Sequence, residues 1–323
     1  MLKPSLTRAV LALLITFITL YISLSPHSVQ AAETHSNTPW PRTITGDDGR
    51  SLTLQQAPKR VLSTSVTITG TLLAIDAPLV ASATANDSRF FDQWQEVAQQ
   101  RNLQPLWPAG SIDLEAAYSV QPDLIIISTT GADSALEQRD ALSQIAPTLV
   151  LNYSSRHWQE LALILGDALG IKPQASRKIE EFNQHVAWVR SQIKIPPGLA
   201  NIVSYNGPGI TNPIATNSGS HARLLTDLGF SIESPNPVWH SGFDQAGDFV
   251  RTEYEYLTHL KAPTTFLLRR ASDDTAAFRQ DPVLANLPSN KTGQVYGLGQ
   301  HSFRIDYFSA MEVVDGVLEN FQP

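Results

Sequence analysis

The sequence predicts an α/β protein made of two α/β lobes joined by one long helix. Two series of alternating strand and helix signals predict the lobes, one over residues 60–170 and one over residues 201–321. Between them, residues 174–194 carry apolar side chains at helical spacing, and a helix of this length spans ~31 Å, about the width of a lobe. The expected boundaries are residues 32–172 for the N-terminal lobe, 173–196 for the connecting helix and 197–323 for the C-terminal lobe.

The first series predicts a parallel sheet. It follows a hairpin signal in residues 43–55, where the alternating pattern is interrupted by Asp48-Gly49. The stretch "PDLIIIST" (122–129) is almost continuously apolar, as is typical of a parallel strand buried on both faces. The expected strands are residues 60–65, 79–84, 122–129 and 147–153, and the expected helices are residues 66–76, 90–100, 113–121, 134–146 and 155–170.

The connecting helix and the second series are predicted by the same rules. In the helix, Ile179, Phe182, Val186, Val189 and Ile193 recur at spacings of three and four, and "IPPG" then ends the pattern. The expected strands that follow are residues 201–206, 263–270 and 293–299, and the expected helical segments are residues 222–230, 253–262, 281–289 and 307–321.

Composition excludes several classes of function. Apolar residues make up 42% of the chain and charged residues 16%, which suits a packed globular protein. The net charge of −7 argues against nucleic acid as a partner. The chain has no cysteine, so disulfides, thiolate metal sites and cysteine nucleophiles are excluded. The eight histidines show no HExxH or other tight ligand spacing, so we expect no directly bound metal, with a bare zinc or manganese site as the alternative.

The first 31 residues predict a cleaved export signal. Lys3 and Arg8 precede an apolar run over residues 9–24, and small residues precede the expected cut after Ala31. A membrane helix needs ~20 apolar residues, so this run is short for a permanent anchor, which is the alternative. Loss of the two cations would change the net charge from −7 to −9. We therefore expect a periplasmic protein whose basic groups have local roles.

Four stretches resemble a known family: "PKRVLSTSVTITGTLLAID" (58–76), "DLEAAYSVQPDLIIIST" (113–129), "LSQIAPTLVLNY" (142–153) and "QVYGLGQHSFRIDYFSAMEVVD" (294–315). They are similar to periplasmic binding proteins that deliver iron–siderophores and cobalamin to ABC importers, above all to the ferric-enterobactin binding subgroup. The resemblance extends over almost the whole mature chain.

That resemblance implies two rigid lobes of the helical-backbone type with a shallow cleft between them. It implies a monomer that captures a ferric catecholate siderophore, holds no cofactor, has no enzyme activity and docks on an inner-membrane ABC permease. The alternatives for the ligand are a hydroxamate or citrate complex of iron, haem and cobalamin.

Arginines are the expected ligand contacts, because a guanidinium donates several hydrogen bonds and suits the oxygens of a trianionic catecholate complex. Arg304 lies in "QHSFRIDYFSAM" (300–311), and we expect it to face the cleft, held by cation–π contacts with flanking aromatic rings. The alternative is that Arg304 pairs with Asp306. Arg89 lies in a loop after a predicted strand, where the strand ends of an open α/β sheet face a cleft.

The second lobe supplies weaker candidates. Arg269 and Arg270 end a predicted strand, and adjacent strand residues point to opposite faces, so we expect at most one of them to reach the ligand. Their alternative partners are Asp273 and Asp274. Further candidates are Trp239, Tyr205 and Arg251, with core packing as the alternative for the two aromatic residues.

The resemblance also implies a docking residue on each lobe. Glu115 matches the family's N-terminal docking glutamate, which pairs with permease arginines. At the matching position of the second lobe the chain has Arg223, so we expect Asp227 to substitute for the missing acid.

A periplasmic hydrolase is the remote alternative from another class. Ser220 stands beside His221, but neighbouring residues at a helix start do not face each other. The chain has no GxSxG, SxxK or HExxH motif and no GxxxxGK[ST] phosphate loop. We therefore expect a binding protein.

Overall fold

The computed structural model describes residues 40–154, 156–242 and 247–323. The predicted export signal and the expected cut at Ala31 lie outside the described residues. Within them, no helix has both the length and the apolar character needed to cross a membrane.

The N-terminal lobe is built on a sheet of five parallel strands. These strands are β3 (Val61–Ser63), β4 (Leu79–Thr84), β5 (Gln104–Pro108), β6 (Leu124–Ser128) and β7 (Thr148–Leu151). Their order is β5-β4-β3-β6-β7, and every neighbouring pair is parallel. All five residues of β6 are buried, as the apolar run predicted.

Helices connect these strands, which confirms the predicted α/β class. They are α2 (Val66–Ala74), α3 (Asp92–Gln100), α4 (Leu114–Ser119), α5 (Arg139–Leu142) after the 3-10 turn η1 (Leu136–Gln138), and α6 (Trp158–Leu169). The predicted hairpin is present as antiparallel β1 (Arg42–Thr45) and β2 (Ser51–Leu54), closed by Gly49 at a φ of 77°.

The C-terminal lobe carries a mixed sheet of six strands. They are β8 (Leu199–Val203), β9 (Asn212–Ala215), β10 (Ser231–Ile232), β11 (Phe249–Thr252), β12 (Thr264–Leu267) and β13 (Val295–Gly297). The order is β11-β9-β8-β12-β13, with β10 beside β8. The sheet is mixed because β9 runs antiparallel to both of its neighbours.

The helical segments of this lobe are short. They are α8 (Ser220–Asp227), α9 (Ala276–Arg279), α10 (Pro288–Thr292) and the 3-10 turns η2 (Pro237–Trp239) and η3 (Tyr254–His259). The helix expected over residues 253–262 is therefore a 3-10 segment. The helical turn expected over residues 281–289 comes later in the chain, as α10.

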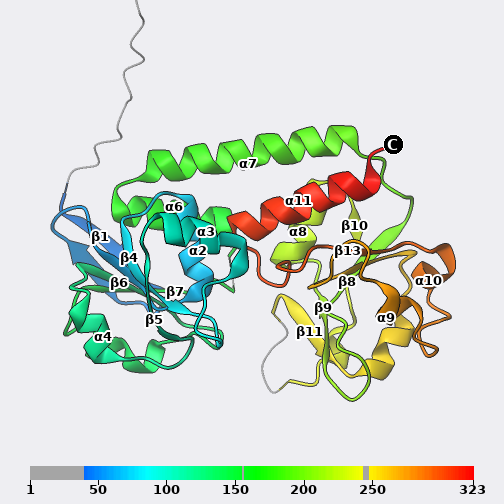
Figure 1. The fold of residues 1–323 in the computed structure, drawn as a ribbon, viewed down its shortest axis with the longest axis horizontal. Helices are drawn as coiled ribbons and strands as arrows, with labels where there is room; N and C mark the ends of the chain where they lie inside the picture. Colours follow the sequence, from blue (N-terminus) through cyan, green and yellow to red (C-terminus); the bar gives the residue numbers. More distant parts are fainter. Residues whose placement is uncertain (1–39, 155, 243–246) are drawn as a thin grey trace, which may run out of the picture. The chain divides into compact units, whose positions relative to one another are not determined.

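Two long helices connect the lobes (Figure 1). The first is α7 (Lys172–Gln192), which begins two residues before the predicted start because Pro173 is well placed in a first helical turn. The second is the terminal helix α11 (Tyr307–Phe321), which contacts α2, α3 and α7. At its other end, the ring of Phe321 lies 5.2 Å from that of Phe230 in the C-terminal lobe.

The main hydrophobic core continues from one lobe into the other. One cluster of buried side chains includes Ile126 of β6, Val189 of α7, Phe266 of β12 and Val314 of α11. A smaller cluster lies in the C-terminal lobe around Phe278. Residues 38–323 accordingly form one unit, so the predicted lobe boundaries stay an interpretation of the two sheets.

Candidate ligand-binding cleft

A cavity of about 530 Å³ is lined by residues of both lobes. Its volume falls within the ordinary range for small-molecule sites. The N-terminal lobe contributes the start of α2 and the segments that follow β6 and β7, because the carboxyl ends of parallel strands meet at one edge of a sheet. The hydroxyl side chains of the wall are Thr67, Thr71, Thr130, Tyr153, Ser154 and Ser220.

The charged side chains of the wall are mainly cationic. Arg156, Arg251 and Arg304 line the cavity, and Asp248 is the acid among the described lining residues. Burial raises the pKa of Asp248 to about 6, so this carboxyl takes up its proton at a higher pH than an exposed aspartate does. Arg156 forms a bidentate pair with Asp47, with Nη2 at 2.6 Å from Oδ1. The cavity is therefore suited to an anionic ligand.

Arg304 belongs to the C-terminal lobe and lines the cavity, and its side chain contacts the N-terminal lobe. Its Nη1 donates to the hydroxyl of Tyr153 at 3.0 Å and, less closely, to Oγ1 of Thr67 at 3.3 Å. No carboxylate of the described residues lies within 4.0 Å of the guanidinium. The alternative pairing with Asp306 is absent, because that buried carboxylate accepts from the backbone N–H groups of Phe308 and Ser309 at the start of α11.

The aromatic neighbours of Arg304 differ from those predicted. The guanidinium lies 5.8 Å from the ring of Tyr153, which comes from the N-terminal lobe. The guanidinium of Arg269 instead lies 4.8 Å from the centre of the Phe303 ring. The ring of Tyr307 packs 5.4 Å from that of Trp158. The prediction failed because α11 begins at Tyr307 and turns the following side chains toward the core.

Neither arginine at the end of β12 lines the cavity. Arg269 adopts a left-handed backbone, with φ of 58°, and its Nη2 donates to Ser204 at 2.8 Å and Asn206 at 2.7 Å. Burial, followed by the neighbouring Arg270, lowers the pKa of Arg269. Arg270 lies 3.6 Å from Asp274, the partner named as its alternative. Arg269 thus supports Phe303, which does line the cavity.

Arg89 lies outside the cavity lining as well. It ends a tight turn after β4, and its side chain is 61% exposed. Its guanidinium donates to Asp87 at 2.9 Å and lies 3.8 Å from Asp92. The expectation that strand ends face the cleft, here called the strand-end rule, located the correct edge of the sheet. The carboxylate of Asp87, however, holds this arginine in the turn.

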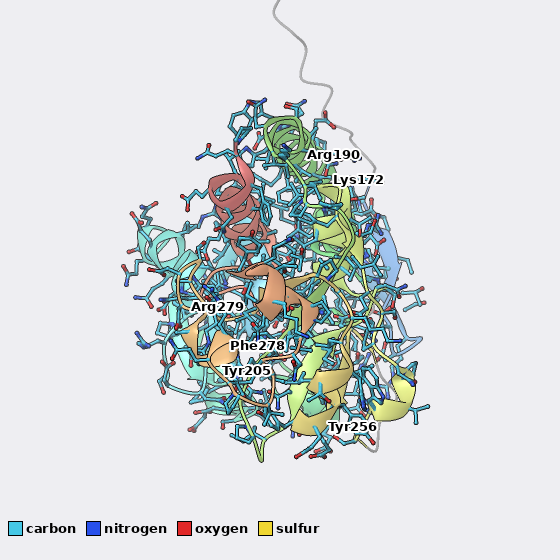
Figure 2. All side chains as sticks on the ribbon, turned by 90° about the vertical axis from the view of Figure 1, so that its right-hand side faces the viewer. Lys172, Arg190, Tyr205, Tyr256, Phe278 and Arg279 are labelled. Atoms are coloured by element: carbon cyan, nitrogen blue, oxygen red, sulfur yellow. The ribbon has the colours of Figure 1, made fainter. Side chains whose placement is uncertain are left out.

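Tyr205 and Trp239 pack on the smaller core cluster rather than in the cavity. The hydroxyl of Tyr205 donates to Asp281 at 2.6 Å, and burial together with this bond raises its pKa to about 12. Its ring meets Phe278 edge-on at 5.3 Å (Figure 2). Trp239 stacks on Tyr256 at 5.7 Å. Core packing, the alternative reading, describes both side chains; their contact with ligand stays a prediction.

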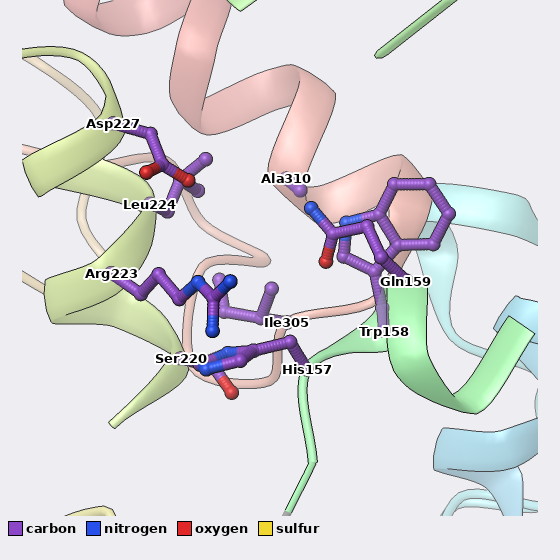
Figure 3. A pocket seen from close by; sticks show the side chains of 9 residues that line it. All are labelled: His157, Trp158, Gln159, Ser220, Arg223, Leu224, Asp227, Ile305 and Ala310. Atoms are coloured by element: carbon purple, nitrogen blue, oxygen red, sulfur yellow. The ribbon is translucent and has the colours of Figure 1, made fainter. Parts of the chain in front are cut away.

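The two expected docking residues have different surroundings. Glu115 is exposed in the first turn of α4, beside the exposed side chains of Leu114 and Tyr118. Asp227 lines a small pocket with Arg223 and His157, at the place where α8 approaches α6 (Figure 3). Arg223 lies 3.9 Å from Glu160 of α6. Docking by either acid stays a prediction, and the setting of Glu115 suits it better.

Three cavity residues were not among those predicted from the sequence: Tyr153, Arg156 and Asp248. Tyr153 and Arg156 follow β7 directly, so the strand-end rule that was applied to Arg89 would have found both. Asp248 stands before β11, a strand that was not predicted. Arg251, a weaker candidate, does line the cavity.

The hydrolase alternative gains no support from the geometry of Ser220 and His221. The imidazole Nε2 donates to the carbonyl of Ser302 at 2.7 Å, and burial lowers the pKa of His221 to about 4. His221 is therefore committed to a structural bond rather than to the Ser220 hydroxyl. His301, another histidine near Arg304, donates from Nδ1 to the carboxylate of Glu312 at 2.9 Å. In the part of the chain that the structure describes, no group of three acidic or histidine side chains is placed to hold a metal ion.

Comparison with known proteins agrees with the fold. The ferric enterobactin-binding periplasmic protein FepB of Escherichia coli O6:H1 (strain CFT073) is 39% identical over 298 residues, which are 89% of this chain and 91% of FepB. The crystal structure of holo-ViuP superposes with a TM-score of 0.86 at 50% identity and covers 88% of this chain and 96% of ViuP. The periplasmic catecholate-siderophore binding protein VctP from Vibrio cholerae shares the fold at 20% identity, with a TM-score of 0.61 and coverage of 87% and 98%.

These relatives confirm the predicted resemblance, and FepB and VctP are binding proteins by name. The model of the periplasmic binding protein family matches residues 61–301, which include both sheets and α7. The chain belongs to the periplasmic binding protein family.

Proposed function

We propose that this protein captures a ferric catecholate siderophore of the enterobactin type in the cavity and delivers it to an ABC permease of the inner membrane. The observation that carries the proposal is Arg304, which lines a cavity of about 530 Å³ with no carboxylate of the described residues within 4.0 Å, while Arg156 and Arg251 line the same cavity. A multiply anionic iron chelate is stabilised by guanidinium groups that also donate hydrogen bonds to its oxygens. The binding of ferric enterobactin by FepB supports this choice of ligand.

The chemistry requires no catalytic group and no resident cofactor. Iron would arrive and leave inside its chelate, so the protein would contact catecholate oxygens rather than the metal. Thr67, Thr130 and Ser154 would add neutral hydrogen bonds at the wall, and the half-buried ring of Phe303 would face the apolar rim of the ligand. In the periplasm, such a protein would carry the chelate from the outer to the inner membrane.

Ligand titration tests the proposal directly. We expect ferric enterobactin to quench the fluorescence of the purified protein, because the buried Trp158 lines the cavity. Ferric hydroxamate, ferric citrate, haem and cobalamin serve as comparison ligands in the same assay. Saturable quenching by one of those ligands, with none by ferric enterobactin, would refute the choice of a catecholate.

A charge deletion tests the site. Arg304→Ala should weaken binding by ~1.5–3 kcal/mol, the usual scale for hydrogen bonds to charged groups. Arg177→Ala is the matched control, because Arg177 is an exposed arginine of α7 outside the cavity lining. Equal dissociation constants for the wild type and Arg304→Ala would remove Arg304 from the site.

A further inference from the structure

Behind the cavity wall, the carboxylate of Asp133 accepts three hydrogen bonds from groups of the N-terminal lobe. The carboxylate is 3% exposed and lies in the turn after β6. One oxygen accepts from the hydroxyl of Ser65 at 2.7 Å and from the backbone N–H of Thr67 at 3.4 Å, and the other accepts from the hydroxyl of Tyr153 at 3.0 Å. Asp133 does not line the cavity, whereas Thr67 and Tyr153 do.

Tyr153 is the link between this carboxylate and Arg304. A tyrosine hydroxyl has one proton, and here Asp133 accepts it, so the lone pairs of the oxygen are left for Nη1 of Arg304 at 3.0 Å. A hydroxyl that donates to a carboxylate is also a stronger acceptor, because bonds in a chain polarise one another. Burial and the charge of Asp133 raise the pKa of Tyr153, so the hydroxyl keeps its proton.

The backbone makes room for this pair. A Cβ atom at Gly131 would lie 1.8 Å from the Tyr153 hydroxyl and 2.8 Å from Oδ1 of Asp133. Gly131 also has a φ of 85°, a conformation that favours glycine. The turn after β6 is therefore compatible with the pair only when it has no side chain at position 131.

The arrangement differs from those of three other arginines of the chain. Arg89, Arg156 and Arg270 each have a carboxylate partner, which offsets their charge. Arg304 donates to the neutral hydroxyl groups of Tyr153 and Thr67. Asp133 accepts from the Tyr153 hydroxyl and from the backbone N–H of Thr67, and it does not line the cavity. The charge of Arg304 therefore remains available to an anionic ligand while its position is fixed.

We propose that Asp133 and Tyr153 are positioning residues, which hold the Arg304 guanidinium in place for the ligand from the opposite lobe without forming an ion pair with it. The proposal rests on the proposed function for its ligand, but the fixed position of Arg304 is a property of the free protein. Fixing the side chain beforehand lowers the entropy lost on binding.

A crystal structure of ligand-free Tyr153→Phe, compared with the ligand-free wild type, tests the positioning without any ligand. We expect a single Arg304 conformer in the wild type, and a displaced or divided guanidinium in the variant with an unchanged backbone. If the guanidinium of Tyr153→Phe keeps the wild-type position, the proposal is wrong. This outcome does not depend on which chelate the protein binds.

A double-mutant cycle that measures ferric enterobactin binding tests whether Tyr153 affects binding through Arg304. Tyr153→Phe should weaken binding about tenfold in the wild type, the scale of one lost hydrogen bond, and should have almost no effect in an Arg304→Ala background. Asp133→Asn, which keeps an acceptor oxygen, should lose less affinity than Asp133→Ala. Tyr296→Phe is the matched control, because Tyr296 lies outside the cavity lining.

Failure of the positioning role can be distinguished from failure of the proposed function. If Tyr153→Phe weakens binding equally with and without Arg304, Tyr153 acts on the ligand directly and the positioning role is refuted. If the wild type does not bind ferric enterobactin, the proposed ligand is wrong, and the crystallographic comparison still decides the positioning role. Thermal unfolding midpoints close to that of the wild type would confirm that each variant is folded.

Discussion

Asp306 shows how one buried side chain can fix the start of a helix. Its Oδ1 accepts from the N–H groups of Phe308 at 2.9 Å and Ser309 at 3.0 Å, while Gln93 of α3 donates to Oδ2 at 3.2 Å. The residue is 1% exposed, and burial raises its pKa to about 6 despite these bonds. The charged form is therefore disfavoured in the folded protein relative to the unfolded chain.

This raised pKa predicts a pH-dependent contribution to stability. Between about pH 4 and pH 6, the folded protein binds a proton at Asp306 that the unfolded chain releases, so this contribution is present at low pH and is lost as the pH rises through about 6. Asp306→Asn keeps a capping oxygen but does not titrate. The variant should gain up to about 3 kcal/mol relative to the wild type on going from pH 4 to pH 7.

Urea unfolding of both proteins at a series of pH values measures this difference. Comparing variant with wild type cancels the other carboxylates, such as Asp47 and Asp281, whose pKa values are lowered in the folded state. A constant difference between the two proteins from pH 4 to pH 7 would contradict the titration of Asp306.

At the scale of elements, α11 and α2 approach closely at Gly70. A Cβ atom at that position would lie 2.4 Å from Oδ2 of Asp306, so the start of α11 requires a glycine in the middle of α2. Gly316, in the interior of α11, is the opposite case, because a Cβ atom there would have no neighbour within 4 Å. Two helical glycines of the same chain are thus expected to respond differently to the same substitution.

Gly70→Ala should destabilise the protein by ~1–3 kcal/mol, the usual effect of adding a methyl group to a packed core. Gly316→Ala should stabilise it by roughly 0.5–1 kcal/mol, because alanine favours helix more than glycine does. Denaturant midpoints of the two variants and the wild type provide the measurement. Destabilisation of similar size at both positions would show that helix packing at Gly70 is looser than described.

At the scale of the whole molecule, α7 and α11 both connect the lobes and share a continuous core with both sheets. A hinge motion between the lobes would have to bend two helices and expose apolar surface. This arrangement supports the rigidity of the two lobes that the family resemblance implies. Recognition by a permease would then depend on surface residues rather than on a large closure of the lobes. Glu115 and Asp227 are both exposed, but Asp227 lines a pocket beside Arg223, so Glu115 is the stronger candidate.

Glu115→Ala should leave the affinity for ferric enterobactin unchanged, because α4 supplies no residue to the cavity. It should weaken binding to the cognate permease by about tenfold, on the scale of one lost interfacial charge pair. Stimulation of permease ATPase activity in proteoliposomes gives the measurement. Glu255→Ala, an exposed acid of the C-terminal lobe, is the control, and equal stimulation by Glu115→Ala and the wild type would refute a docking role.

The sequence alone determined the α/β class, the connecting helix and every parallel strand of the N-terminal lobe except β5, which Pro105 and Pro108 interrupt. Local periodicity is sufficient there, because β6 is apolar throughout and α7 repeats its apolar positions over 21 residues. It could not predict the two- to four-residue strands β9, β10 and β11, which are too short to show a period and depend on pairing with distant segments.

Only the tertiary structure decided which polar residues line the cavity. Arg89 and Arg304 looked equally suitable in the sequence, but a carboxylate two residues away holds the first, while the second reaches Tyr153, 151 positions earlier in the chain. Asp133 and Gly131 gave no local signal, because their roles exist only where the ends of β6 and β7 and the start of α2 meet. Contacts between residues far apart in the chain follow from the packing of whole elements, and no local pattern of residue types encodes them.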